Sequence, residues 1–382
     1  MELHKATYKI GGFERLIKVL CIITFVCVLL LSACGGSVEP DSQTEKEAAT
    51  TYHSIDICAF EPPRMVGFTC GMYTVFLEPA YFQGQMEFDE IISAQRTIAV
   101  FQANGNIEHT ENFRGAAVKA REGRIDFVFE DGRRIVNIAG IIADPPEIGV
   151  TQVYEDALRL LQNGHRVTVV VLDGWGIKTY HYFADMQPFL HNIHSENAQV
   201  AHTVFPPYTP VVMSSIFTGT LPNVHGVHDR RTRIMAAPDI FEAAVDLGFS
   251  VTQVQGAVNV VRTSADVVLM PDLNNEFGTD DEVFDASMAR INDSDLMFIH
   301  FKGIDDQGHT YGPFAAQVGE RIALIDGFLE QLLHARGGAF IIVGDHGMSD
   351  SSDLNDPRRL GDHRWISHED FFVPYIIIFG GE

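Results

Sequence analysis

Beyond residue 148 the chain alternates between short apolar runs and longer segments with helical periodicity. Strands are expected at residues 167–172, 250–254, 296–301, 340–343 and 375–379. Helices are expected around 153–161, 238–247 and 314–335, followed by glycines at 164, 248 and 337–338. Because this alternation is typical of βαβ units, we expect an α/β fold, a doubly wound and mostly parallel sheet with helices on both faces.

Aspartate and histidine follow three of these apolar runs. Asp173 comes directly after the run at 167–172, and Asp345-His346 follows the run at 340–343. Asp305 and His309 come shortly after the run at 296–301, at a spacing that can place both on one side of a turn. The carboxyl ends of parallel strands are where α/β proteins bind ligands. Asp and His together, without nearby Cys, suit Zn²⁺ or Mn²⁺, so the pattern predicts a metal-dependent enzyme.

Two motifs carry a resemblance to a known family. Asp305, Gly308 and His309 are followed by Gly312-Pro313, and residues 344–348 read Gly-Asp-His-Gly-Met. In this order and spacing the chain resembles the alkaline phosphatase superfamily, especially its nucleotide pyrophosphatase/phosphodiesterase-like branch, over residues 166–380. The resemblance implies an alkaline-phosphatase-like fold and hydrolysis of phosphate esters at a site with two divalent metal ions, zinc in first place and manganese as the alternative.

The resemblance also implies the metal ligands. Asp305, His309 and a later histidine would hold one metal ion. Asp173, Asp345 and His346 would hold the other. The family places the later histidine about eleven residues before a Val-Pro pair; counting back from residues 373–374 reaches His363, with His368 as the alternative.

The family's nucleophile is a Thr or Ser ten residues before the Gly of a Thr-Gly pair. Here that pair is Thr218-Gly219, so the resemblance implies Thr209. Pro210 suits the first helical position, which makes Thr209 a predicted N-cap at the positive end of a helix dipole. Contact with a metal ion would make Thr209 a stronger nucleophile, and a covalent phosphothreonine would form before water releases the phosphate.

One position departs from the family pattern. The phosphodiesterase branch has an Asn twenty-one residues after the nucleophile, where this chain has Arg230, next to Arg231. A guanidinium is a charged fork suited to two oxygens of a dianion, so Arg230 raises the possibility of a phosphate monoester substrate. Lys302, three residues before Asp305, is a second candidate for substrate binding.

The same motifs are compatible with further functions. A phosphoethanolamine-type transferase is the main rival, because residues 300–305 and 344–348 also resemble the glycosylphosphatidylinositol ethanolamine-phosphate transferases, which carry many membrane spans. A phosphate monoesterase and an inactive binding protein of the cell envelope also fit these residues. A phosphoglycerate mutase is disfavoured, because the residues between Thr209 and Asp305 leave little room for its inserted domain. A sulfatase is disfavoured by the missing nucleophile signature.

The N-terminus is typical of a targeting segment. A basic stretch with Lys5, Lys9, Arg15 and Lys18 precedes an uncharged apolar run from 19 to 33. The run is short for a membrane span, although a short membrane anchor would also fit it. Leu-Ser-Ala-Cys at 31–34 resembles the bacterial lipobox. We therefore expect a signal peptide at 1–33, lipidation of Cys34, a flexible tether at 34–50 and a location in the cell envelope, outside the cytoplasm.

Residues 51–147 are predicted to form a small β-rich accessory domain ahead of a catalytic domain at 148–382. Strands are expected at 97–101, 124–130 and 134–138, with Asp131-Gly132 as a hairpin turn. After processing, Cys58 and Cys70 would be the cysteines left in an oxidising compartment, so we expect a disulfide between them.

The formal net charge of −24 restricts the partners. Nucleic-acid binding needs a basic surface, and anionic lipid head groups repel an acidic one. We therefore expect a small phosphorylated substrate, contact with a membrane through the lipid anchor, and no binding of nucleic acid.

Overall fold

The computed structural model describes residues 60–380 apart from 81, 83, 194, 275–277, 352–355 and 357. All described residues belong to one compact unit. The predicted signal peptide, the tether, Cys34 and Cys58 lie outside the described residues. Cys70 has no disulfide partner among the described residues, and its thiol donates to the Ser93 carbonyl oxygen at 3.1 Å. The Cys58–Cys70 disulfide therefore stays a prediction.

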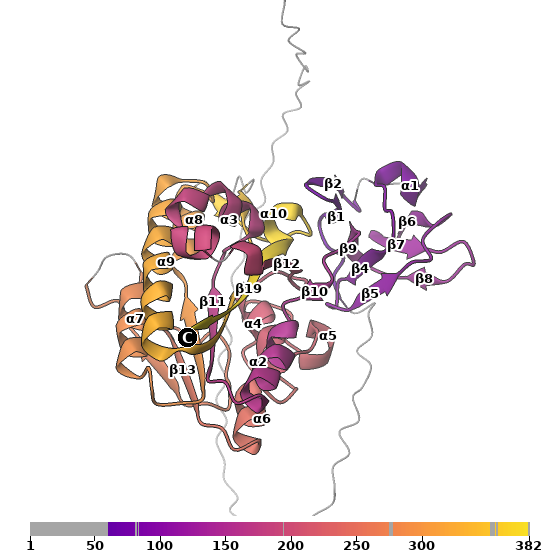
Figure 1. Cartoon of the computed structure of the whole chain (residues 1–382). Coiled ribbons are helices and arrows are strands. Elements are labelled where there is room, and N and C mark those ends of the chain that lie inside the picture. Colours follow the sequence, from indigo (N-terminus) through magenta and orange to yellow (C-terminus); the bar gives the residue numbers. More distant parts are fainter. Residues whose placement is uncertain are drawn as a thin grey trace, which may run out of the picture. The chain divides into compact units, whose positions relative to one another are not determined.

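An eight-stranded sheet forms the centre of the fold, in the order β10-β12-β19-β16-β11-β15-β13-β14 (Figure 1). Strand β11 (Val167–Leu172) pairs in parallel with both β15 (Leu296–Phe301) and β16 (Gly338–Gly344). Strand β19 (Phe372–Gly380) runs antiparallel to its two neighbours, β16 and β12 (Ala198–His202). The other strands are β10 (Ile148–Gly149), β13 (Val251–Gly256) and β14 (Val267–Met270). The predicted α/β class with a mostly parallel sheet is confirmed.

Side chains of the central strands alternate between two cores, one on each face of the sheet. Val170 and Leu172 of β11 pack with helices α3 (Ile177–Tyr182), α7 (Asp280–Ala289) and α9 (Ala316–Arg336). Val167, Val169 and Val171 pack with α2 (Gln152–Gln162), α4 (Thr209–Thr218) and α6 (Ile240–Asp246) on the opposite face. Because both faces are covered, the strands are continuously apolar. The remaining helical segments include α5 (Pro222–His225), α8 (Gly303–Tyr311), α10 (His368–Phe371) and short turns at 184–186, 188–193 and 195–197.

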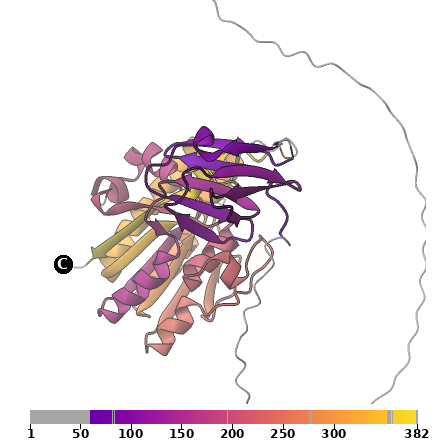
Figure 2. The same ribbon diagram turned by 90° about the vertical axis from the view of Figure 1, so that its right-hand side faces the viewer.

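The N-terminal part of the described chain is β-rich, as expected (Figure 2). One sheet has the order β2-β1-β9-β4-β5, and a second has the order β3-β6-β7-β8. Their elements are β1 (Val66–Cys70), β2 (Tyr73–Leu77), β3 (Gln85–Glu87), α1 (Phe88–Ile91), β4 (Ile98–Gln102), β5 (Ile107–Thr110), β6 (Ala117–Arg121), β7 (Arg124–Val128), β8 (Arg134–Ile135) and β9 (Ile138–Ala143).

Strand β4 connects this β-rich part to the central sheet. Its Ile98 and Val100 face a core within the β-rich part. Its Ala99 and Phe101 belong to the same core as α9 and the central strands. The two regions therefore share a hydrophobic core.

The expected strand at 134–138 is interrupted. Asn137 has φ +52°, a left-handed conformation that ends a strand, and its N–H donates to the buried Asp126 carboxylate at 2.9 Å. The residues on its two sides consequently belong to different sheets, as β8 and β9. The predicted turn at Asp131-Gly132 is confirmed, with β7 and β8 antiparallel and φ +86° at Gly132.

Among the described residues, no helix has the length and apolar character that crossing a membrane requires.

A short antiparallel pair, β17 (Ser349–Asp350) with β18 (Gly361–Asp362), lies between β16 and β19 in the sequence.

Candidate metal centre

Three aspartates gather at the carboxyl edge of the sheet. Asp173 follows β11 and Asp345 follows β16, while Asp305 lies in the first turn of α8, just after β15. Because β16, β11 and β15 are neighbours in the sheet, their ends bring the three carboxyl groups together. All three residues are buried, with exposed fractions of 0%, 3% and 0% for Asp173, Asp305 and Asp345.

Three histidines complete the cluster, and the backbone orients each ring. The Nδ1 atoms of His309, His346 and His363 lie 2.7, 2.9 and 2.6 Å from the carbonyl oxygens of Gly361, Gly347 and Pro207. A carbonyl oxygen can only accept, so each Nδ1 carries the proton. Each Nε2 therefore keeps its lone pair, which is the arrangement of metal-binding histidines whose other nitrogen is fixed by a carbonyl.

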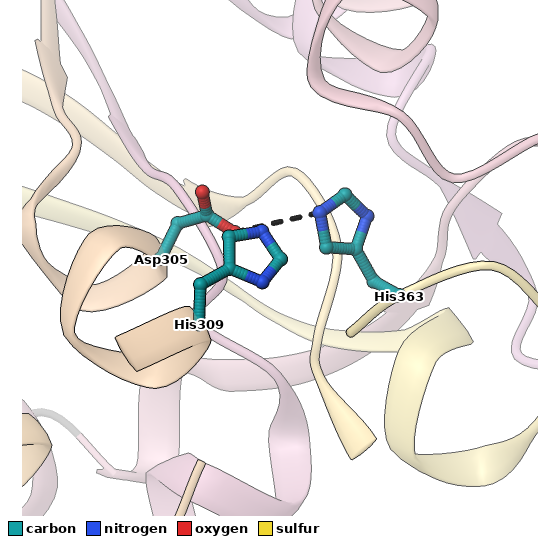
Figure 3. Close-up of side chains that lie close together, drawn as sticks. All are labelled: Asp305, His309 and His363. Atoms are coloured by element: carbon teal, nitrogen blue, oxygen red, sulfur yellow. Dashed lines mark ion pairs between the residues drawn. The ribbon is translucent and has the colours of Figure 1, made fainter. Parts of the chain in front are cut away.

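The ligand atoms form two overlapping groups. Asp305, His309 and His363 form one group, and Asp173, Asp305 and His346 form the other, each with ligand atoms within 4.8 Å of one another. Figure 3 shows the first group, with Asp305 and His309 on α8 and His363 on a separate segment. Asp345 adjoins the second group, because its Oδ2 lies 3.2 Å from the Nε2 of His346.

The structure thus brings together all six side chains that the resemblance implies as ligands, with Asp305 common to both groups and Asp345 beside the second. His363, and not His368, joins Asp305 and His309. His368 belongs to α10, where its ring packs edge-on against Phe372 at 5.3 Å.

The residues present fit a pair of cations. Asp173 Oδ2, Asp305 Oδ1 and Asp345 Oδ2 are buried and have no aligned hydrogen-bond donor among the described residues. Buried carboxylates without compensation are costly, and divalent cations compensate such groups. The Asp and His donor set suits zinc or manganese, so the site is chemically ready for the metal ions that the sequence implies.

The close approach of these groups shifts their pKa values in different directions. Burial, together with repulsion from Asp345 and Asp305, raises the pKa of Asp173 to about 6. Burial also raises the pKa of Asp345 to about 7. Burial would raise the pKa of Asp305 as well, but the close approach of His309 and the charge of Lys302 outweigh it and hold that pKa well below its ordinary value.

The pKa values of the three histidines are also shifted in different directions. Burial, reinforced by the neighbouring His346, lowers the pKa of His363 well below its ordinary value. Burial also lowers the pKa of His346. Burial acts to lower the pKa of His309, but the carboxylate of Asp305, 3.1 Å from Nε2, outweighs burial and raises it. At neutral pH the imidazoles of His346 and His363 are therefore neutral.

Thr209 lies beside the second group. Its Oγ1 is 3.4 Å from Asp173 Oδ1 and 3.4 Å from His346 Nε2. The N-cap prediction is wrong by one residue, because Tyr208 is the N-cap of α4 and Thr209 is its first helical residue. The hydroxyl therefore makes no capping bond and is directed to the carboxylate and the imidazole.

The two predicted substrate-binding cations approach different members of the cluster, Arg230 approaching His363 and Lys302 approaching Asp305. Arg230 is exposed, stacks over the Tyr208 ring at 4.3 Å, and has its Nη2 3.5 Å from His363 Nε2. Lys302 forms ion pairs with Asp305, at 3.5 Å, and with Asp306. Burial acts to lower the pKa of Lys302, but the charge of Asp305 outweighs burial and raises it. The ammonium group therefore stays charged.

Two residues of the site were missed from the sequence. His300 is buried on β15, with Nε2 3.2 Å from Asp173 Oδ2. Arg359 places Nη2 2.8 Å from His309 Nε2 and 3.2 Å from Asp362 Oδ1. The alternation of β15 could have placed His300 beside Asp173, because the two strands are parallel neighbours. Arg359 precedes β18 in a polar stretch that carries no such signal.

Comparison with known proteins identifies a family for this region. The sequence model of the type I phosphodiesterase / nucleotide pyrophosphatase family matches residues 167–233 and 236–371, together just over half of the chain. These ranges include all six candidate ligands and Thr209.

Individual relatives match more distantly. The chain is 33% identical over 91 residues to GPI ethanolamine phosphate transferase 1 of Yarrowia lipolytica, covering 20% of this chain and 10% of the relative. It is 32% identical over 76 residues to GPI ethanolamine phosphate transferase 3 of Eremothecium gossypii, covering 19% and 8%. The chain thus spans about a tenth of the length of these curated relatives.

Solved structures with a similar arrangement include phosphonoacetate hydrolase from Sinorhizobium meliloti 1021 in complex with phosphonoacetate. It is 20% identical, with a TM-score of 0.41, over 61% of this chain and 62% of that one. Another is an inactive variant of murine ectonucleotide pyrophosphatase / phosphodiesterase 5 in complex with AMP. It is 14% identical, with a TM-score of 0.42, over 55% of this chain and 87% of that one.

Proposed function

Because the chain belongs to the type I phosphodiesterase / nucleotide pyrophosphatase family, we propose that it hydrolyses esters of a small phosphorylated substrate at the Asp/His cluster. The nucleophile is Thr209, and a phosphothreonine forms and is then hydrolysed. The observation that carries this proposal is the position of the Thr209 hydroxyl, 3.4 Å from both Asp173 and His346 at the start of a helix.

The chain's own groups would hold two divalent metal ions, of which the Asp and His mixture favours zinc. Asp305, His309 and His363 would hold one ion, and Asp173, Asp345 and His346 the other. When bound, such ions supply positive charge that stabilises an alkoxide nucleophile and the developing negative charge on phosphorus and the leaving oxygen.

The residues themselves direct the reaction. Thr209 loses its hydroxyl proton as its oxygen bonds to phosphorus and the ester oxygen departs as the alcohol. The positive end of the α4 dipole favours the phosphate beside Thr209. Water then cleaves the phosphothreonine bond, releasing phosphate or a phosphate ester and restoring the hydroxyl.

Substitution of Thr209 tests the proposal. In the zinc-loaded full chain, Thr209→Val removes the hydroxyl while keeping the shape, so turnover of nitrophenyl phosphate esters should fall by at least about a thousandfold. Thr209→Ser keeps a hydroxyl and should retain measurable turnover. Acid quenching during turnover should leave a phosphoryl group on the Thr209 peptide by mass spectrometry. Unchanged turnover in Thr209→Val would exclude Thr209 as the nucleophile.

Transfer of a phosphoethanolamine-type group is a second candidate, favoured by the identity with the two ethanolamine phosphate transferases. Such a reaction would use an alcohol in place of water in the second step. Incubating the enzyme with phosphatidylethanolamine and an acceptor sugar distinguishes the two functions. Transfer to the sugar would support a transferase, and release of free phosphoethanolamine would support a hydrolase.

We further propose that lipid on Cys34 anchors the protein in the cell envelope, outside the cytoplasm, on the basis of the Leu-Ser-Ala-Cys sequence. Expressed in a bacterium, the chain should fractionate with membranes and yield an acylated N-terminal Cys34 peptide. Cys34→Ser should prevent acylation and processing. Mass spectrometry of an unprocessed, unacylated wild-type N-terminus would contradict the proposal.

A further inference from the structure

Two arginines far apart in the sequence each place a guanidinium group beside one histidine of the same metal-binding group. Arg359 Nη2 lies 2.8 Å from His309 Nε2, and Arg230 Nη2 lies 3.5 Å from His363 Nε2. These two imidazole nitrogens both face Asp305 Oδ1, at 3.1 and 3.5 Å. The two arginines therefore border one and the same metal-binding group.

Each guanidinium is held in place but keeps donors for another partner. Arg230 lies over the ring of Tyr208, the residue directly before Thr209, and its side chain is exposed. Stacking uses the face of a guanidinium and not its N–H donors. Arg359 is half-buried, with 28% of its side chain exposed and an ion pair to Asp362. Its Nε is buried and has no hydrogen-bond partner among the described residues.

Among the described residues, the acidic groups near these arginines do not balance their charge. Asp362 is shared between Arg359 and Arg364, and Asp306 pairs with Lys302. The three carboxylates of the cluster face two divalent ions in the proposed enzyme. Two additional guanidiniums leave an excess of positive charge, so the site favours a dianion over a monoanion.

Phosphate monoesters and diesters differ in their negative charge. A monoester at neutral pH carries two negative charges on three non-esterified oxygens, whereas a diester carries one charge on two. We propose that Arg230 and Arg359 bind the non-esterified oxygens of a phosphate monoester dianion, which makes terminal phosphate groups the substrate class. This inference deepens the proposed function and rests on it.

The test compares a monoester with a diester in matched arginine variants. In the zinc-loaded full chain, wild type should have a higher kcat/KM for nitrophenyl phosphate than for bis-nitrophenyl phosphate. Arg230→Ala and Arg359→Ala should each lower the monoester kcat/KM by about tenfold to a hundredfold, the usual effect of a lost charged hydrogen bond, and the diester value by less than about threefold.

The chain offers a neighbouring control for each arginine. Arg231 is exposed beside Arg230, and Arg358 has a 91% exposed side chain beside Arg359. Arg231→Ala and Arg358→Ala remove the same charge one residue away and should leave the monoester-to-diester ratio within about twofold of wild type. An equal loss in these controls would indicate a general effect of net charge and would overturn the assignment.

Phosphate binding gives a readout that does not require turnover. Calorimetric titration of inorganic phosphate into zinc-loaded Thr209→Val should give a Kd that Arg230→Ala or Arg359→Ala, added to that background, weakens by about tenfold or more. Thermal melting confirms that each variant is folded, and Arg359→Gln replaces Arg359→Ala where it is not.

The outcomes separate the two proposals. If ester turnover depends on Thr209 but wild type prefers the diester, this inference is overturned and the proposed function stands. The same conclusion follows if turnover depends on Thr209 and the arginine variants lose equal activity on both esters. No turnover of either ester by wild type overturns the proposed function. In that case an unchanged phosphate Kd in the arginine variants overturns this inference as well.

Discussion

Gly174 determines how closely the end of β11 approaches helix α8. It has φ +78°, and a Cβ at this position would lie 2.9 Å from the Cα of Asp305. Gly174→Ala should therefore cost about 1–3 kcal/mol of stability through backbone strain and steric overlap. It should also displace Asp305 from Asp173 and weaken zinc binding, as measured by urea unfolding and zinc titration.

Gly164 provides the matched control for Gly174. It has φ +86°, but nothing lies within 4 Å of its Cβ position. Gly164→Ala should thus show the strain cost alone and bind zinc as wild type does. Equal zinc affinity in both variants would show that contact between Gly174 and Asp305 does not shape the site.

His202 makes stability depend on pH away from the metal centre. Burial, with a smaller contribution from the nearby His109 of β5, lowers the pKa of His202 to about 4, although its Nδ1 bonds to the Thr203 carbonyl. The unfolded chain, with an ordinary pKa of 6.5, takes up the proton first. This stability is therefore complete above pH 6.5 and is lost as the pH falls toward 4, by about 3 kcal/mol at most.

Substitution isolates the contribution of His202. His202→Gln should flatten the fall in unfolding free energy between pH 7 and pH 5, whereas His334→Gln, at an exposed position of α9, should leave it unchanged. Urea unfolding at several pH values measures both. A slope as steep in His202→Gln as in wild type would refute the assignment.

At the scale of single elements, helix α6 depends on its N-cap. Asp239 accepts hydrogen bonds from the N–H groups of Phe241 and Glu242, and also from the N–H and hydroxyl of Ser264. Asp239→Ala should cost about 2–3 kcal/mol, because four donors in buried or partly buried hydrogen bonds lose their partner. Asp246→Ala, at the exposed last residue of the same helix, should cost less than about 0.5 kcal/mol by urea unfolding. Similar losses would contradict the capping role.

The elements predicted most accurately are those whose side chains are buried on both faces. The apolar runs at 167–172 and 296–301 coincide with β11 and β15. Errors occur where a polar group decides the geometry, as at Asn137, where a bond to Asp126 splits the expected strand. At the start of α4 the expected cap is displaced by one residue, because the site takes the Thr209 hydroxyl.

At the scale of the whole molecule, metal binding should link the separate strand ends. Zinc at about a thousand times its Kd should stabilise the folded chain by about 4 kcal/mol, and a chelator should reverse this together with the activity. His363→Ala should lose most of the zinc effect on Tm, while His368→Ala should retain it, because His368 lies outside the cluster. Equal zinc effects in these two variants would show that His363 is not a ligand.

The sequence alone determined the class of fold and the residue types of the site, because buried parallel strands are readable as apolar runs and their ends carry the Asp and His motifs. Only the tertiary structure placed His363, and not His368, beside Asp305 and His309, made Asp305 common to both candidate groups, and brought His300 and Arg359 to the cluster. These outcomes depend on which strands are neighbours and on how loops fold back over them. Such relations join residues that are 50 positions apart, as for Arg359 and His309, or more than a hundred apart, as for His300 and Asp173. Local sequence patterns do not encode them.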